Sequence, residues 1–244
     1  MKNKIEVYSK KIVRRIVGVY YELLKIDFLR NGYCRFRYFL LKGRVRISEA
    51  YGESVGAYTI KHNMDALNEA AAFGMGNRMA LLIYPIAAML RNRKDAKVLI
   101  VGPRTEDDIF WARSLGLRNT RGFDLFTYSV HIDIGDIHKT SFEDGYFDAV
   151  ILGWVISYSC NPEIMVDECK RIVKPGGYIA FGVESNPEHR NSGSFKPPRV
   201  NSINSGKDIV AIARMPIVFI HDPEEEKSSD NAVIFQTTVV GGYN

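Results

Sequence analysis

The sequence predicts an α/β protein with a doubly wound, mostly parallel sheet, an antiparallel hairpin at its C-terminal edge and a helical basic N-terminal extension. Three observations lead to this fold class. Short apolar runs such as 98–101 and 147–152 have the continuous hydrophobicity of strands buried on both faces. They alternate with amphipathic helical segments, as parallel strands joined by crossover helices do. The last two apolar runs, 217–220 and 232–240, have no helical segment between them, so we expect them to pair antiparallel.

Composition places the chain among globular proteins. It has 244 residues, of which 46% are hydrophobic and 25% charged, which suits one domain and an extension. Residues 1–50 contain 13 Lys and Arg against 4 Asp and Glu, whereas the remainder is mildly acidic. We therefore divide the chain into a basic extension, residues 1–62, and an α/β domain, residues 63–244.

The sequence shows no membrane-spanning or secretory segment. No apolar run reaches the roughly 18 residues that a spanning helix needs, and the basic N-terminus lacks the apolar core and cleavage site of a secretory signal. Cys34, Cys160 and Cys169 are widely spaced and form no Cys-x-x-Cys pair, so we interpret them as reduced thiols. No cluster has metal-ligand spacing. These features predict a cytoplasmic protein without a metal, and leave peripheral attachment to a membrane open.

The extension begins with an amphipathic helix from Ser9 to Leu29. Apolar residues recur there at helical spacing, and basic residues occupy the other side. Such a helix is typical of contact with an anionic membrane surface, or of docking on another domain. Packing on the sheet with a solvated basic face is the alternative. Residues 35–46 mix aromatic and basic side chains and predict no single element.

The remaining elements follow from local signals. Thr105 offers a helix N-cap with Asp108 three residues later. Pro162 opens another helix, which the turn at 175–177 ends. In order, we expect helices at 63–72 and 77–90 (with a kink at Pro85), strand 98–101, helix 105–115, strands 121–124, 131–134 and 147–152, helix 162–174, strand 178–183 and the final strand pair.

Three motifs carry a specific resemblance. They are Gly135-Asp136-Ile137-His138, the run 142–151 with its Phe147-Asp148 pair, and the run 171–177 that ends in Lys-Pro-Gly-Gly. In this order and spacing the chain resembles the class I S-adenosylmethionine (SAM)-dependent methyltransferases, and among them the broad type 11 methyltransferase domain. The resemblance extends from about Lys97 to Val183. It implies a Rossmann-like sheet and S-adenosyl-L-methionine as cofactor.

The resemblance also implies a cofactor site at the carboxyl ends of the strands, where open α/β sheets bind ligands. Gly102, with Pro103 and Arg104, would turn the chain under the methionine part of the cofactor. Asp124 would accept hydrogen bonds from the ribose hydroxyls. The adenine would be flanked by Asp136 and Ile137, and the reacting methyl by Trp154. His138 is a further candidate for contact with the cofactor.

The sequence departs from the family pattern at two places. The family usually has an acidic residue two positions before the first loop glycine and further glycines after it. These places hold Ile100, Arg104 and Glu106. We hypothesise that Glu106 or Asp107 receives the cofactor's ammonium instead. In addition, only 11 residues separate Asp124 from Asp136, so we expect the helix between the second and third strands to be short or absent.

The loop at 102–108 also discriminates between cofactors. NAD needs a glycine-rich loop whose N–H groups approach a pyrophosphate at a helix N-terminus. This loop lacks that pattern, and Glu106, Asp107 and Asp108 would repel a pyrophosphate. SAM carries an ammonium and a sulfonium, which suit the same carboxylates. Their alternative role is to complement the helix dipole.

Methyl transfer requires the protein mainly to position two reactants and, for a hydroxyl acceptor, to remove a proton. His189, after the strand at 178–183, is the first candidate base and His138 the second; both equally suit surface or structural histidines. The acceptor would be recognised by the extension, the loop 185–204 and the acidic loop 222–230. We favour O-methylation of a small molecule, saccharide or glycolipid, and contact of the extension with an anionic membrane surface is one hypothesis for how it reaches such an acceptor.

Two other functions remain open. The basic extension and its aromatic residues would also suit an RNA methyltransferase, and a protein acceptor is a further option, but no recognised nucleic-acid module is present. The altered loop at 102–106 also suits a catalytically inactive, methyltransferase-like binding protein. The sequence does not determine the acceptor atom or the oligomeric state.

Overall fold

The computed structural model describes residues 2–49, 58–68, 77–93, 95–185, 201–223 and 229–238. A seven-stranded sheet lies at its centre. Its strands are β2 (Lys97–Val101), β3 (Asn119–Asp124), β5 (Ile132–Ile134), β6 (Phe147–Gly153), β7 (Val173–Ser185), β8 (Ile217–His221) and β9 (Ser229–Gln236). Their order is β5-β3-β2-β6-β7-β9-β8. The first five are parallel, and β9 is antiparallel to both of its neighbours. The predicted fold class is confirmed.

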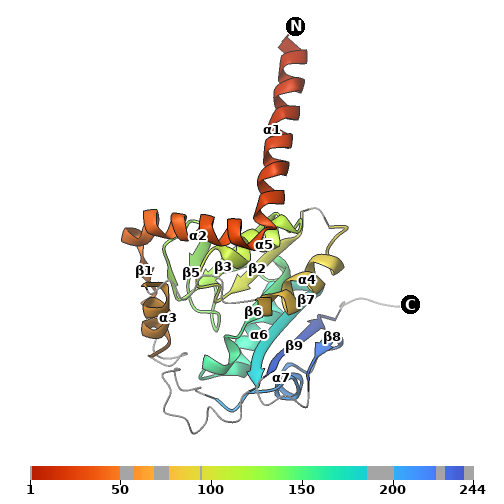
Figure 1. Cartoon of the computed structure of the whole chain (residues 1–244). Helices are drawn as coiled ribbons and strands as arrows, with labels where there is room; N and C mark the ends of the chain where they lie inside the picture. The colour runs from red at the N-terminus through yellow and green to blue at the C-terminus, as the bar shows by residue number, and fades with distance from the viewer. Residues whose placement is uncertain are drawn as a thin grey trace, which may run out of the picture.

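Helices cover both faces of the sheet (Figure 1). Helices α4 (Ala80–Met89) and α5 (Asp107–Ser114) lie on one face, and α6 (Pro162–Ile172) and α7 (Gly206–Ala213) on the other. In β2, Val98 and Ile100 pack into the cluster with α4 and α5, whereas Leu99 and Val101 pack into the cluster with α6 and α7. Successive side chains of a strand point to opposite faces. With both faces covered, the whole apolar run is buried.

The N-terminal extension forms two helices where one was predicted. Helix α1 (Lys2–Leu24) projects away from the sheet, and α2 (Asp27–Leu41) lies across the domain (Figure 1). The chain is extended at Ile26, with φ −83° and ψ 111°. No glycine or proline marks this break. Arg30 Nη1 donates to the carbonyl of Leu24 at 3.1 Å, so a side chain of α2 satisfies a carbonyl that the end of α1 leaves unpaired.

The extension shares a core with the domain. Cys34 and Tyr38 of α2 pack with Phe110 of α5 and with Phe126 and Tyr128, which follow β3. The division of the chain after residue 62 stays a prediction. The packing makes α2 part of the structural unit that contains the sheet.

The helix between β3 and β5, expected to be short or absent, is absent, because this fully described stretch holds a two-residue strand, β4 (Phe126–Thr127), instead. It pairs antiparallel with β1 (Arg46–Ile47) of the extension, which follows a turn of 3-10 helix, η1 (Lys42–Arg44). The extension therefore contributes strand β1 as well as helix α2 to this side of the domain.

Several boundaries differ from the sequence prediction. The helix expected at 63–72 starts earlier than predicted, as α3 (Tyr58–Asn68), and residues 69–72 lie outside the described part of the chain. The helix expected at 77–90 is a 3-10 turn, η2 (Asn77–Met79), followed by α4, which contains Pro85. The Pro175–Gly177 motif lies inside β7, where it shifts the register with β6, and does not form a separate turn. Helix α7 was not predicted. Ser205 caps it by accepting from the N–H of Asp208 at 3.2 Å.

Three global features bear on function. None of the helices in the described part of the chain is long and apolar enough to cross a membrane. The three cysteines are free thiols, with Cys34 and Cys169 buried and Cys160 exposed. Within the described ranges, His, Cys, Asp and Glu form no group suited to hold a metal ion.

Candidate active site

A cavity of about 380 Å³ opens at the carboxyl ends of β2, β3, β5 and β6. This volume lies within the range of small-molecule sites, roughly 300–1,000 Å³. The strand order reverses between β2 and β6, so the cavity lies at the switch point where open α/β sheets bind ligands. The residues that line it include Gly102, Pro103, Arg104, Asp107, Asp108, Asp124, Asp136, Ile137 and Trp154. Most of the predicted cofactor residues therefore meet at one site.

The backbone of the loops around the cavity is unusual. Gly102 has φ +66°, and a Cβ atom there would lie 2.3 Å from Val155 Cγ1, so only glycine fits. Three described non-glycine residues have positive φ, and two of them, Arg104 (57°) and Trp154 (58°), line the cavity. Strained backbone of this kind concentrates at functional sites, where the surrounding structure maintains it.

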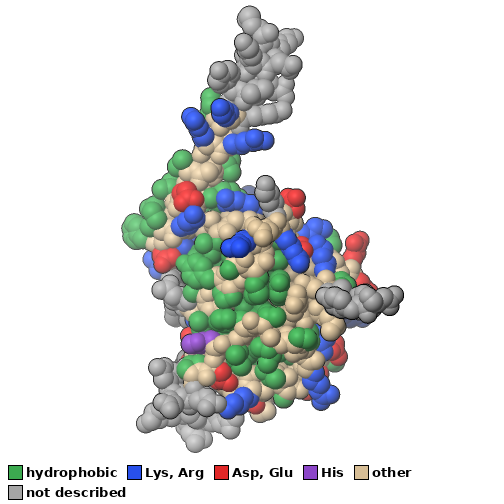
Figure 2. Space-filling model, turned by 90° about the vertical axis from the view of Figure 1, so that its right-hand side faces the viewer, with side chains coloured by type: hydrophobic (Ala, Val, Ile, Leu, Met, Phe, Trp, Pro, Cys, Tyr) green, Lys and Arg blue, Asp and Glu red, His purple; other side chains and the backbone are tan. Residues whose placement is uncertain are grey.

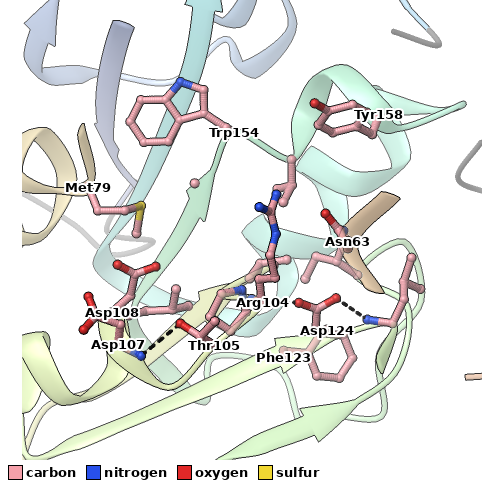
Figure 3. Close-up of a pocket in the computed structure, with 18 of the residues that line it drawn as sticks. Asn63, Met79, Arg104, Thr105, Asp107, Asp108, Phe123, Asp124, Trp154 and Tyr158 are labelled. Carbon is pink, nitrogen blue, oxygen red and sulfur yellow. Dashed lines mark hydrogen bonds between the residues drawn. The ribbon is translucent and has the colours of Figure 1, made fainter. Parts of the chain in front are cut away.

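Asp124 is the last residue of β3 and is buried. Its carboxylate accepts hydrogen bonds from the N–H of Arg104 at 3.1 Å and the N–H of Leu125 at 2.7 Å. Burial raises the pKa of Asp124 to about 6, although these hydrogen bonds and the Arg104 guanidinium act in the opposite direction. In Figure 3 the Arg104 side chain extends toward Trp154 and Tyr158, with Asp108 and Asp124 on either side.

Asp136 lines the cavity beyond the end of β5, and His138 lies behind it. The N–H of His138 donates to Asp136 Oδ1 at 2.9 Å, and His138 Nδ1 lies 2.6 Å from the same oxygen. Nε2 lies 2.5 Å from Ser159 Oγ. Both ring nitrogens are thus engaged, and His138 is not among the lining residues. The geometry makes His138 a support for Asp136, and its expected cofactor contact and its role as second candidate base stay predictions.

The carboxylate of Glu106 points away from the cavity. It is fully buried and accepts hydrogen bonds from Arg37 Nε at 2.5 Å and Arg37 Nη2 at 2.8 Å, and from the Ser129 hydroxyl. Glu106 is therefore not placed to contact a ligand, which corrects both its predicted cofactor contact and its suggested role as ammonium acceptor. Asp107, the other suggested acceptor, does line the cavity, as does Asp108.

These two acids differ in their surroundings. Asp107 accepts from Arg30 Nε at 3.0 Å; burial raises its pKa, and the Arg30 charge opposes that rise. Burial raises the pKa of Asp108 to about 7, and the neighbouring Asp107 charge adds to the effect. Asp108 is therefore a carboxyl group whose ionisation a cationic ligand would favour.

Helices α2 and α3 contribute to the cavity, which the sequence did not predict. The lining includes residues of α2 and α3, among them Asp27, Arg30, Asn31, Thr59 and Asn63. Arg30 is only 3% exposed, and its guanidinium lies 4.8 Å from the centre of the Trp111 ring. The basic composition of the extension indicated a surface role for its arginines. No sequence signal pairs Arg30 with an acid 77 positions later.

Arg78, just before α4, was also missed. Its guanidinium lies 4.4 Å from the centre of the Trp154 ring, which places a cation on an aromatic wall of the cavity. Even so, the charged residues of the lining are predominantly acidic. The acids are Asp27, Asp107, Asp108, Asp124, Asp136 and Glu184, and the bases are Arg30, Arg78 and Arg104.

Some predicted residues lie outside the described part of the chain. His189 and most of the loop 185–204 are among them, as is the central part of the acidic loop 222–230. Their assignment as base, lid and acceptor loop stays a prediction.

Comparisons with known proteins identify the domain. Residues 111–181 match the family model described as a methyltransferase domain. No curated protein matches the chain. A chain from the Haloferax volcanii complex of the Trm112 methyltransferase activator with a methyltransferase is 16% identical, with a TM-score of 0.55 over 75% of this chain and 100% of that one.

Two further solved structures share the fold. The cyclase SpnF is 12% identical, with a TM-score of 0.56 over 80% of this chain and 100% of its own. The trans-methyltransferase CalH, solved with SAH, is 14% identical, with a TM-score of 0.51 over 65% of this chain and 56% of its own. The motifs at 135–138, 147–148 and 174–177 all lie inside the matched segment, so the family model supports the resemblance to the SAM-dependent methyltransferases over that part of the chain.

Proposed function

We propose that the protein transfers a methyl group from S-adenosyl-L-methionine, bound in the cavity at the ends of β2, β3, β5 and β6, to an oxygen of a small molecule, saccharide or glycolipid. The observation that carries this proposal is the convergence of Asp124 and Asp136, from the ends of two neighbouring strands, on one cavity within a methyltransferase domain. The excess of acids in the lining suits a cofactor that carries a sulfonium and an ammonium.

The residues present fit this cofactor. Gly102 lets the chain turn at the end of β2 against Val155, where a Cβ atom would collide with the Val155 side chain. Asp124, a buried carboxylate, can accept hydrogen bonds from two hydroxyls of a ribose. Asp136, which His138 holds in place, would lie beside the adenine, and Asp107 and Asp108 would bind the ammonium group.

When bound, the cofactor supplies an electrophilic methyl group, so this chain's own residues mainly bind and orient the reactants. Trp154 and Tyr158 provide aromatic walls that would exclude water from the acceptor side. We assign proton removal from a hydroxyl acceptor to His189, on the sequence alone, because this residue lies outside the described part of the chain.

One observation favours a second candidate function, in which the protein binds a ligand in this cavity but transfers no methyl group. Arg104 occupies a loop position where the family usually has glycine, and its buried guanidinium has a lowered pKa because burial disfavours the charge. The cyclase SpnF has the same fold, so the fold alone does not determine the reaction.

The decisive experiment is calorimetry of the purified protein with SAM, S-adenosylhomocysteine and NAD, followed by a radiolabelled methyl-transfer screen with saccharides and glycolipids. We expect micromolar binding of the first two ligands and none of NAD. A protein that binds neither SAM nor S-adenosylhomocysteine would contradict the proposal. Tight binding without transfer to any acceptor class would favour the second candidate.

The affinity for SAM is expected to rise with pH between 5.5 and 7, below the range of about 7.7–8.0 in which an α-amino group titrates. A cationic ligand favours the ionised form of Asp108, whose pKa lies near 7. Lowering the pH protonates this group, and binding weakens. When the pH falls from 7 to 5.5, the affinity of the wild type for SAM should decrease by a factor about tenfold larger than that of Asp108→Asn, because binding is linked to the loss of one proton. The variant should keep the smaller dependence due to Asp124, whose pKa is about 6.

Calorimetry in buffers of different ionisation enthalpy checks this linkage, because binding should release protons from the wild type at pH 6.5. Equal pH dependence of the wild type and Asp108→Asn would show that Asp108 does not face the bound cation.

A further inference from the structure

Helix α2 presents its charged side to the protein and its apolar side to solvent. Arg30 and Arg37 face α5 and pair with Asp107 and Glu106. On the outward side, Phe28 is 83% exposed, Phe36 60% and Phe39 66%, and Leu29 and Leu40 are exposed beside them. This is the reverse of the usual arrangement for a helix on a soluble domain. The burial of Arg30 and the ion pair of Arg37 with the buried Glu106 fix the helix in this orientation.

Helix α1 continues the apolar surface beyond the domain. Its last turn packs on α5 and α2 through Leu24 and its neighbouring tyrosines, whereas residues 11–19 are exposed on every side. Ile12, Ile16, Val19 and Leu23 recur at intervals of three and four, so they share one side of the helix. Figure 1 shows α1 projecting from the domain, and Figure 2 shows apolar side chains along it, with basic side chains near its outer end.

Cations flank this surface. By helical spacing, Arg15 borders the apolar strip of α1 and Lys11 lies at its side, whereas Arg14 lies on the opposite side of the helix; Arg35 is exposed on α2. At the end of α2, Lys42 Nζ lies 5.0 Å from the centre of the Phe39 ring. Long basic side chains beside an apolar strip can extend to charged groups while the strip itself is buried.

We propose that the α1–α2 surface docks on an anionic lipid bilayer, with the apolar residues at the level of the acyl boundary and the flanking cations at the headgroups. The surface consists of Ile12, Ile16, Val19, Leu23, Ile26, Phe28, Leu29, Phe36, Phe39 and Leu40. An interfacial helix combines these features, since buried apolar area and attraction to anionic lipids act together.

Charge favours a bilayer over a second copy of the chain as the occupant. The extension carries a large excess of Lys and Arg over Asp and Glu, so two copies joined through this surface would bring like charges together. Anionic headgroups supply the opposite charge. The three phenylalanines on one short helix also match the preference of aromatic rings for the interface.

Docking would bring the cavity close to the lipid. Asp27, Arg30 and Asn31 line the cavity from α2, the helix whose outer side carries the three phenylalanines. Only the thickness of this helix, about 10 Å, then separates the cavity wall from the bilayer. If the protein is the methyltransferase proposed above, its methyl acceptor is therefore a molecule anchored in the lipid.

The first test is co-sedimentation of the full-length protein with vesicles of phosphatidylcholine alone, or mixed with phosphatidylglycerol. We expect binding to the mixed vesicles that weakens as salt is raised. The triple variant Phe28→Ser/Phe36→Ser/Phe39→Ser and the pair Lys11→Gln/Arg15→Gln should each lower the partition coefficient about tenfold or more. Matched controls are Ile164→Ser, exposed on α6, and Arg91→Gln/Lys139→Gln, which should bind as the wild type does.

The second test places a reporter in the surface. In Phe28→Trp the added indole is the exposed one, because Trp111 and Trp154 are buried. Its emission should shift to the blue with anionic vesicles and be quenched by brominated acyl chains. Wild-type levels of vesicle binding by the triple variant would overturn the proposal. A second result would also overturn it. The wild type would form a dimer without lipid, detected by sedimentation equilibrium, and would not bind vesicles, and the triple variant would be monomeric. These readouts need no cofactor, so their failure is distinct from failure of the methyltransferase proposal.

Discussion

The substitution Arg37→Met is expected to lower the free energy of unfolding by about 3–5 kcal/mol, because it leaves a buried carboxylate without its cation. Glu106 is fully buried, and Arg37 donates to both of its oxygens. Methionine keeps most of the apolar stem of Arg37 and loses the guanidinium, including its weak contact with the Phe110 ring, so the loss is chiefly electrostatic. Urea unfolding followed by circular dichroism measures the change.

A double-mutant cycle separates this ion pair from general packing. Glu106→Gln removes the charge, so Arg37→Met/Glu106→Gln should be more stable than Arg37→Met alone. The control is Arg121→Met, which breaks an exposed pair with Asp133 and should cost at most about 1 kcal/mol. If Arg37→Met behaves like Arg121→Met, α2 is not anchored through Glu106.

The fold was predictable because its signals are local. The runs at 98–101 and 147–152 are apolar throughout and short, which is the pattern of a strand covered on both faces, and both are strands in the structure. Helix α7 was missed although Ser205 and Asp208 form a capping pattern. The break at Ile26 was missed for a different reason, since it depends on Arg30 reaching back to Leu24 once α2 has packed.

The site was predictable as far as it is formed by strand ends. Asp124 and Asp136 follow parallel strands, and parallel strands bring their carboxyl ends to one edge. Side-chain direction within the loop after β2 was not predictable. Glu106 and Asp107 are adjacent in sequence, yet only Asp107 lines the cavity, because the Glu106 carboxylate pairs with Arg37 of α2 instead. Pairings across some 70 residues leave no trace in one sequence.

The substitution Asp124→Asn is expected to weaken SAM binding by about 100-fold or more. The carboxylate offers charged acceptors for ligand hydroxyls, and each such hydrogen bond contributes about 1.5–3 kcal/mol. An amide keeps one acceptor and puts an NH₂ group where the second oxygen was, beside backbone N–H groups that already donate to Asp124. Calorimetry with SAM and S-adenosylhomocysteine measures the loss, which should be similar for the two because they share the ribose.

Two further variants show whether the effect belongs to the ligand or to the loop. Asp167→Asn removes an exposed carboxylate of α6 and should bind as the wild type does. Asp124→Glu keeps the charge but moves it by one methylene, so geometric recognition predicts a substantial loss here too, whereas a purely electrostatic role predicts near-normal affinity. Thermal unfolding of each variant without ligand reports damage to the loop itself. If Asp124→Asn has wild-type stability and binds SAM with an affinity within threefold of the wild type, Asp124 does not contact the cofactor. The proposal that the ribose lies at the end of β3 would then be wrong.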